Sequence, residues 1–321
     1  MREALFVKQN SARWKQYEKE PTHDPDELAE RFIYITDDLA YAKTFYPESK
    51  TTAYLNTLAG GFHQDIYKNK KEQASRFVKF WQFELPLLFA KYRVQLLCSF
   101  IFFTSFFLVG VISAHYDTGF VRFIMGDAYV NMTNANIAKG DPFGVYKQEN
   151  SYLMFYQIAS NNLGAMVQAF VMGILFAVGT IYALFKNGVM LGAFEYFFFS
   201  KGLGLKSILV IWIHGTLEIS CIIISGGAGL VLGSGIIFPQ TYKRLIAFKN
   251  AAKDGMKMVL GITPIIVLAA IFESFVTRHT EMPVWTSLLI LSGSLGFIAW
   301  YVVIYPSYLT KTLTLTSNDP A

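Results

Sequence analysis

Charged residues are scarce in this chain of 321 residues. Asp, Glu, Lys and Arg together make up 16% of the sequence, whereas hydrophobic residues make up 53%. A soluble domain usually carries about 25% charged residues, so this composition argues against a soluble protein and for one that lies in lipid. The net charge of +5 is small and is explained by basic loops beside membrane helices. It gives no reason to expect nucleic-acid binding.

Cysteine is also rare. The two cysteines, Cys98 and Cys221, both lie inside apolar runs, where a free thiol behaves as a small hydrophobe. They give neither a disulfide framework nor the spacing of a zinc site. The amino-terminus is charged, and the first long apolar run begins near Val94. We therefore expect no secretory signal peptide, and we expect the residues before that run to stay in the cytoplasm.

Motifs that mark common enzyme active sites are missing as well. The sequence contains no Walker A loop, no dinucleotide fingerprint and no G-x-S-x-G elbow. The order H-G-T-L-E at 214–218 lacks the second histidine of an HExxH zinc motif, and no third ligand follows nearby. We therefore expect a non-enzymatic protein with no catalytic residues, no cofactor site and no metal site.

The charges that are present gather in the amino-terminal part and at 240–257. Residues 1–93 show the spacing of amphipathic helices, for example at Leu28 and Phe32, and predict a cytoplasmic helical domain. This domain ends in a basic segment, 68–93, in which Lys and Arg are interleaved with aromatic residues. We expect that segment to lie along the inner membrane surface and to orient the first membrane helix.

Long apolar runs follow, and they predict an all-α, polytopic integral membrane bundle. A helix needs about 20 apolar residues to cross a hydrocarbon core of ~30 Å. We expect about six spans, an outer loop at 116–160 and a cytoplasmic tail at 307–321. Both termini then lie in the cytoplasm of a bacterial inner membrane, which agrees with the two basic regions. The expected membrane domain is 94–306, with spans at 94–115, 163–185, 188–200, 207–238, 258–276 and 285–305.

Two of these runs do not have the length of a simple span. The run 188–200 follows an expected turn at 186–188 and is too short to cross a bilayer unaided, whereas 207–238 is too long for one straight crossing. A short run beside an overlong, glycine-rich one predicts helices that are broken or tilted within the membrane. The sequence leaves open whether 188–200 spans fully or is re-entrant.

Five polar residues form a candidate intramembrane site. His214 and Glu218 are one helical turn apart on the same face, and a charge at the bilayer centre costs ~2.5–3.5 kcal/mol. The pair is either a structural link between two helices or a functional site, and the sequence does not decide. Glu195 and Glu273 lie near the expected span ends, where an interfacial role is as good an interpretation as a functional one. Asn187, in its expected turn, is placed to reach the His214–Glu218 pair.

Small residues continue the same helix beyond Glu218. Gly229-x-x-x-Gly233 is a helix-contact motif, because glycine lets two backbones approach closely. Contact with another helix of the same chain is the main interpretation, and a homodimer is the alternative. The glycines expected to pack against helices are Gly188, Gly215, Gly226, Gly229 and Gly233.

The ordered motifs resemble one family. They are N-N at 161–162, K-N-G-V-M-L-G at 186–192, I-H-G-T-L-E at 213–218 and G-G-A-G-L-V-L-G at 226–233. Together with F-V-K-Q-N-S-A-R-W near the start and D-L-A-Y-A at 38–42, this set resembles the stage II sporulation protein M family. The resemblance covers most of the chain and implies a polytopic membrane protein of unassigned molecular activity. The matching positions are Asn187, Gly188, His214, Gly215 and Glu218.

Two functions follow as expectations. The family's namesake in spore formers is similar to a scaffold that joins cell-wall hydrolases, so the first expectation is a non-enzymatic inner-membrane scaffold or assembly partner of a cell-envelope complex. Its partners would be the lipid bilayer and unidentified membrane or cell-wall proteins. The alternative is a transporter or channel that uses the buried His and Glu side chains. Water access along 207–235 separates the two, because transport requires a path.

Overall fold

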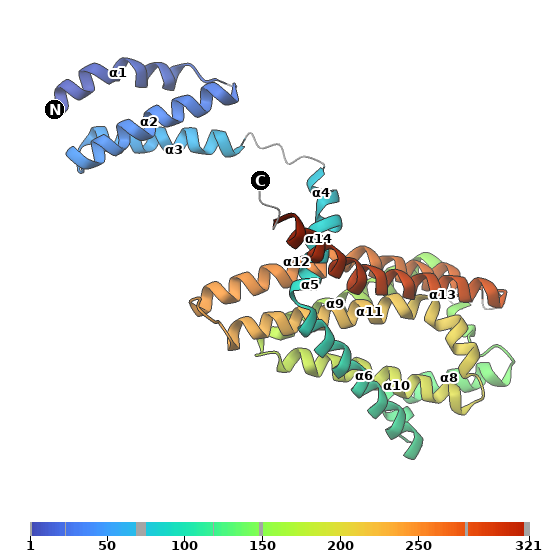
Figure 1. The fold of residues 1–321 in the computed structure, drawn as a ribbon. Helices are drawn as coiled ribbons and strands as arrows, with labels where there is room; N and C mark the ends of the chain where they lie inside the picture. Colours follow the sequence, from blue (N-terminus) through green and yellow to red (C-terminus); the bar gives the residue numbers. More distant parts are fainter. Residues whose placement is uncertain are drawn as a thin grey trace. The chain divides into compact units, whose positions relative to one another are not determined.

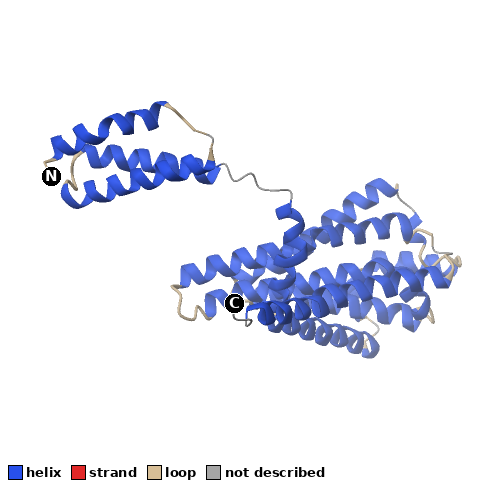
Figure 2. Ribbon diagram, turned by 45° about the horizontal axis from the view of Figure 1, so that its top comes forward, coloured by secondary structure: helices blue, strands red, loops and turns tan. Residues whose placement is uncertain are grey.

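The computed structural model describes residues 2–22, 24–68, 75–117, 119–147, 150–279 and 282–317. Within these residues every regular element is a helix and there is no strand (Figure 1). The chain divides into two compact units, Met1–Phe77 and Val78–Ala321, and Figure 2 shows helices throughout both. The prediction of an all-α protein is confirmed.

The amino-terminal unit consists of α1 (Glu3–Lys19), α2 (Pro25–Phe45) and α3 (Lys50–Lys68). The Asp24 side chain caps α2 by accepting a hydrogen bond from the Asp26 backbone N–H, which satisfies one of the free donors at the start of the helix. The three helices share one core, built from Phe6, Trp14, Leu28, Ile35, Leu39, Ala42, Leu55, Ala59 and Phe62. The unit therefore buries its own apolar surface.

The second unit begins earlier than the sequence predicts. The division falls after Phe77 and not at 93, because much of the expected basic surface segment packs into the second core. That segment forms α4 (Ser75–Lys79), a π-helical turn η1 (Phe80–Glu84) and α5 (Leu85–Lys91), while residues 69–74 lie outside the described ones. Leu85 and Phe89 are fully buried, and the Trp81 indole N–H donates to the Gly261 carbonyl at 2.9 Å.

Long helices make up most of the second unit. They are α6 (Arg93–Tyr116), α9 (Ser151–Val171), α10 (Val178–Ser200), α11 (Gly204–Ile237), α12 (Arg244–Ile271) with the π-helical turn η4 (Phe272–Val276), and α13 (Val284–Ala299) with the π-helical turn η5 (Trp300–Ile304) and α14 (Tyr305–Ser317). In the described part four stretches are long and apolar enough to cross a membrane: Arg93–Tyr116, Gly204–Ile237, Arg244–Val276 and Val284–Leu313. These four are fewer than the six spans that the sequence predicts.

The segment expected as an outer loop, 116–160, is largely helical. It contains α7 (Phe120–Met125), α8 (Asp127–Ala138) and the 3-10 turn η2 (Gly144–Lys147). The next helix, α9, begins at Ser151, well before the expected start at 163. The connection between α6 and α9 is therefore mostly helical and not an extended loop.

The helix break in this part of the chain lies elsewhere than predicted. Residues 186–188 are inside α10, where the Asn187 amide donates to the Ala183 carbonyl of its own helix at 2.8 Å. The turn lies instead after α9, at η3 (Met172–Ile174) and at Phe176 and Ala177, whose φ angles are 54° and 65°. The predicted short run at 188–200 is thus part of a helix of 23 residues, or ~35 Å, and it is not a short helix.

Of the two arrangements predicted for the overlong run, a break is absent, because α11 is one helix of 34 residues, or ~51 Å. A tilted helix stays a prediction. The glycines of α11 mark close approaches of other backbones. A Cβ at Gly229 would lie 2.5 Å from the Ala169 carbonyl oxygen, and a Cβ at Gly233 would lie 2.5 Å from the Ala177 nitrogen. The end of α9 and the turn between α9 and α10 therefore pack against the face of α11 that carries Gly229 and Gly233.

Three other glycines were expected in the same role. A Cβ at Gly188 would lie 2.9 Å from the Phe103 carbonyl oxygen of α6, and one at Gly226 would lie 2.6 Å from the Ser99 hydroxyl. Gly215 does not match its prediction, because no described neighbouring atom lies within 4 Å of a Cβ built there. Gly215 therefore has room for a side chain.

Contacts between the helices fix their relative directions. Gly188 faces Phe103 and Gly192 faces Phe107, so α6 and α10 run parallel. The α11–α12 pair is antiparallel, because Cys221 lies near Ile262 while His214, earlier in α11, contacts Thr277 beyond the end of α12. The end of α5, just before α6, lies near the first half of α12, where Lys91 forms an ion pair with Asp254 at 2.7 Å.

Candidate functional site

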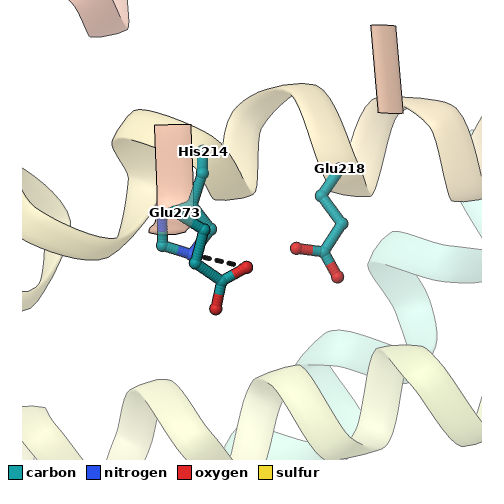
Figure 3. A group of neighbouring side chains, drawn as sticks. All are labelled: His214, Glu218 and Glu273. Carbon is teal, nitrogen blue, oxygen red and sulfur yellow. Dashed lines mark ion pairs between the residues drawn. The ribbon is translucent and has the colours of Figure 1, made fainter. Parts of the chain in front are cut away.

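Three of the predicted polar residues meet in the second unit. One ligand atom from each of His214, Glu218 and Glu273 can be chosen so that all three lie within 4.8 Å of one another. Figure 3 shows the two α11 side chains pointing to the same side of their helix, with Glu273 between them and closest to His214. The His214 Nε2 and Glu273 Oε2 atoms are 3.8 Å apart. We call these three residues the His–Glu cluster.

The π-helical turn η4 supplies Glu273. Here the chain departs from the α-helical register, and the Thr277 N–H donates to the Phe272 carbonyl at 2.8 Å. Glu273 and Thr277 are one turn apart and reach the two nitrogens of the same imidazole. Thr277 Oγ1 lies 2.9 Å from His214 Nδ1, and both residues are buried. The His214 ring is therefore held in one orientation, with Nε2 toward Glu273.

Helix α9 completes the surroundings of Glu218. The Asn162 side chain lies against Glu218, is 5% exposed, and its Nδ2 atom has no partner of hydrogen-bonding geometry among the described residues. The neighbouring Asn161 amide lies 3.5 Å from Asn162 Oδ1. A buried amide nitrogen without a well-placed acceptor is costly, so the Asn162 nitrogen leaves hydrogen-bonding capacity on this side of the cluster.

Helix α8 lies near the Glu273 side of the cluster. Tyr129 of α8 is close enough to Glu273 to respond to its charge. Burial raises the pKa of the Tyr129 phenol to about 12, and the Glu273 charge acts in the same direction. The phenol therefore keeps its proton at neutral pH.

The cluster lies far along the bundle from the Lys91–Asp254 ion pair. Asp254 and Glu273 lie on one continuous helical stretch, and at 1.5 Å per residue their separation is ~28 Å, close to the ~30 Å thickness of a hydrocarbon core. A cavity of about 120 Å³ is lined by Thr277, together with Lys206, His279 and other residues. That volume has room for several water molecules, and Thr277, at its wall, also contacts the His214 ring.

The other two predicted residues have different partners. Glu195 is buried, and its carboxylate accepts hydrogen bonds from Trp212 Nε1 at 2.7 Å and from the Ser207 hydroxyl at 3.2 Å. It links α10 to α11 away from the cluster, and Asn187 bonds to its own helix. Sequence reasoning missed Thr277 and the role of Asn162. The N-N pair at 161–162 was a signal for the second, whereas nothing in the sequence signals the first.

The cluster is suited to holding protons or a cation. Two carboxylates and an imidazole lie together in a poorly solvated place, so ionised carboxylates there need a compensating positive charge. Cys221, one turn beyond Glu218, does not join the cluster, because its Sγ faces the Ile262 carbonyl at 3.9 Å. The polar atoms on offer are therefore nitrogen and oxygen.

Two families match different parts of the chain. Stage II sporulation protein M matches residues 99–278, which include all three members of the His–Glu cluster. A domain of unknown function (DUF8413) matches residues 4–68, which correspond to the helices of the amino-terminal unit. No curated protein and no solved structure matches the chain significantly. Because the first match covers more than half of the sequence, the chain belongs to the stage II sporulation protein M family of membrane proteins.

Proposed function

We propose that this protein is a non-enzymatic, multi-pass protein of the bacterial inner membrane that assembles other proteins of the cell envelope, in particular those that remodel the cell wall. The observation that carries the proposal is the separate amino-terminal unit. It has its own core and lies outside the four long apolar stretches. It also corresponds to a family match of its own. A folded unit added to a membrane bundle is suited to binding partners.

The surface of that unit supports the same role. Tyr34 and Phe45 are about three turns apart on one side of α2, and they are 42% and 57% exposed. Aromatic side chains are enriched where proteins bind one another. Beneath them the fold is held by Asp38, whose carboxylate accepts from the Trp14 indole at 2.7 Å and pairs with Arg13 at 2.6 Å. The unit therefore offers apolar surface on a fixed framework.

The packing of the membrane unit supports assembly over transport. From Gly229 onward, α11 packs against backbone atoms of Ala169, Gly173 and Ala177 at distances that leave no room for a side chain. This close packing lies on the opposite side of Glu218 from His214 along α11. A transport path through that end of the bundle would require these backbone contacts to open.

The proposed topology has six crossings with both termini in the cytoplasm. Helices α9 and α10 lie between α6 and α11 in the chain, and the parallel α6–α10 pair and the antiparallel α11–α12 pair agree with a chain that alternates direction at each helix. The basic residues at 240–257 and at the start of α6 lie at one end of the bundle, which agrees with the excess of Lys and Arg typical of the cytoplasmic side.

Co-purification from the native membrane tests the assembly role. Three forms carry the same carboxyl-terminal tag: the full chain, a chain lacking residues 1–68, and the double variant His214→Gln with Glu218→Gln. We expect the full chain and the double variant to recover the same proteins, and the shortened chain to lose them. A shortened chain that reaches the membrane at normal levels and recovers the full set would contradict the proposal. So would a double variant that keeps its partners yet loses function.

Transport is the second candidate, and the buried His–Glu cluster is the observation that favours it, because ionisable residues inside membrane bundles commonly mark ion pathways. Single cysteines introduced along 207–235, in a chain with Cys98→Ser and Cys221→Ala, report water access. Reaction with an impermeant thiol reagent from both sides of the membrane would support transport. If no introduced cysteine along 207–235 reacts with the reagent, whether it is added outside or inside, transport is excluded.

A further inference from the structure

Charge balance is the first argument for a ligand in the His–Glu cluster. Its two carboxylates and its imidazole lie within 4.8 Å of one another, and His214 is 3% exposed. A neutral imidazole with two ionised carboxylates carries a charge of −2. A poorly solvated place does not tolerate that charge unless a cation is bound. One divalent cation would bring the net charge of the cluster to zero.

The orientation of His214 is the second argument. A histidine that ligates a metal almost always uses its other ring nitrogen in a hydrogen bond that fixes the ring. His214 shows this arrangement, since Nδ1 lies 2.9 Å from the Thr277 hydroxyl and Nε2 points toward Glu273 at 3.8 Å. With Nδ1–H donating to Thr277, the Nε2 lone pair is directed at the space between the carboxylates.

Asn162 is an independent observation that points to a ligand. Its side chain is more than nine-tenths buried and lies against Glu218, yet its Nδ2 atom meets no acceptor at hydrogen-bonding geometry among the described residues. An amide carries a donor nitrogen and an acceptor oxygen on one rotatable group. Rotation about its last side-chain bond brings the oxygen to the side of Glu218, where it would serve as a further neutral ligand. Helix α9 therefore contributes to the same place as α11 and η4.

We propose that His214, Glu218 and Glu273 bind one divalent transition-metal ion of the zinc type. One imidazole and two carboxylates match the ligands that Zn²⁺ takes in proteins, with bonds of about 2.0–2.2 Å. Two ligands of one such ion lie ~3–4 Å apart, so small side-chain rotations close the cluster around it. Soft Cu⁺ prefers sulfur, and Ca²⁺ takes 6–8 oxygen ligands. Neither fits this set.

Such an ion would join the middle of α11 to the end of α12. Its ligands come from two antiparallel helices, so binding would favour the paired arrangement by mass action. This inference does not depend on the proposed assembly role, because a metal that stabilises the bundle is compatible with either assembly or transport. The bound ion would link α11 to η4, whereas the same cluster without an ion would lower the stability of the bundle.

The test uses the full chain in detergent micelles, with an affinity tag that contains no histidine. The protein is treated with a chelator, dialysed against Zn²⁺ alone and measured for metal content, and Co²⁺ is then used as a spectroscopic probe. We expect one Zn²⁺ per chain and a Co²⁺ absorption spectrum that Zn²⁺ abolishes by competition. A chain without bound Zn²⁺ would overturn the proposal and would leave protons as the ligands of the cluster.

Variants locate the ion. His214→Gln, Glu218→Gln and Glu273→Gln should each abolish the Co²⁺ spectrum, whereas Glu195→Gln, a matched buried glutamate outside the cluster, should keep it. Thr277→Val removes only the hydrogen-bond partner of His214 Nδ1 and should weaken metal binding by about 10–100-fold. This variant tests the proposal even if a ligand variant fails to fold. Binding that survives in the triple ligand variant, or an unchanged affinity in Thr277→Val, would assign the metal to another place.

Discussion

The hydroxyl of Thr277, at the end of η4, lies 2.9 Å from Nδ1 of His214 in the middle of α11. Both side chains are buried, so removal of one leaves the other without its partner. Thr277→Val should therefore destabilise the metal-free protein by about 1–3 kcal/mol, seen as a lower midpoint of thermal unfolding in detergent. Thr263→Val is the matched control, because the Thr263 hydroxyl donates to the Val259 carbonyl of its own helix. Equal losses for both would contradict the account.

Gly229 should not tolerate a side chain. An added Cβ would lie 2.3 Å from Thr180 Oγ1 and 2.5 Å from the Ala169 carbonyl oxygen, so Gly229→Ala forces α11 away from its neighbours at a cost of about 1–3 kcal/mol. Gly215→Ala, in the same helix, meets open space and should raise stability by up to about 1 kcal/mol, because alanine favours the helix. Thermal unfolding of the two variants gives the comparison, and a tolerated Gly229→Ala would show that this packing is wrong.

The turn before α10 should accept glycine. Ala177 has φ of 65°, a conformation that costs an L-residue roughly 1–2 kcal/mol, so Ala177→Gly relieves strain and should leave stability unchanged or raise it. Ala183→Gly, in the interior of α10, removes a buried methyl group from a regular helix and should cost about 1 kcal/mol or more. If Ala177→Gly lowers the unfolding midpoint as much as Ala183→Gly does, the left-handed turn is not at that position.

The proposed topology places the end of α8 and the basic first turns of α12 on opposite sides of the membrane. In a chain with Cys98→Ser and Cys221→Ala, a cysteine in place of Lys139 should react with an impermeant reagent added outside intact cells. A cysteine in place of Lys249 should react only after the cells are opened. The reverse pattern would place the termini outside. If both cysteines react from the same side, the chain crosses the membrane one time fewer between positions 139 and 249 than the proposed topology has it.

Apolar composition was enough to predict the membrane bundle, because a helix that crosses lipid needs a long uncharged run whatever its neighbours are. It was not enough to place the turn between α9 and α10. Lys186-Asn187-Gly188 contains good turn residues, yet Asn187 bonds within its own helix. Phe176 and Ala177 contain no turn signal, and they bend because Gly229 and Gly233 of a later helix let the backbone approach. That cause is tertiary and cannot be read from a local window.

The candidate site was predictable only in part, because some of its features are local to one helix and others arise from packing between helices. Helical spacing puts His214 and Glu218 on one face, since only the geometry of a single helix is involved. Glu273 joins them because α12 packs antiparallel to α11 and ends in a π-helical turn, and neither feature is local to the sequence. Glu195, with similar surroundings in the sequence, is taken up by Trp212 and Ser207 instead.

The central claim is that the amino-terminal unit binds the partners and the bundle holds it at the membrane. The most direct measurement fuses residues 1–68 to an unrelated single membrane helix, expresses the fusion in native cells and identifies the proteins that co-purify with it. The account predicts that the fusion recovers the same envelope proteins as the full chain. Recovery of none of them by the fusion, together with recovery of all of them by a chain lacking residues 1–68, would contradict it.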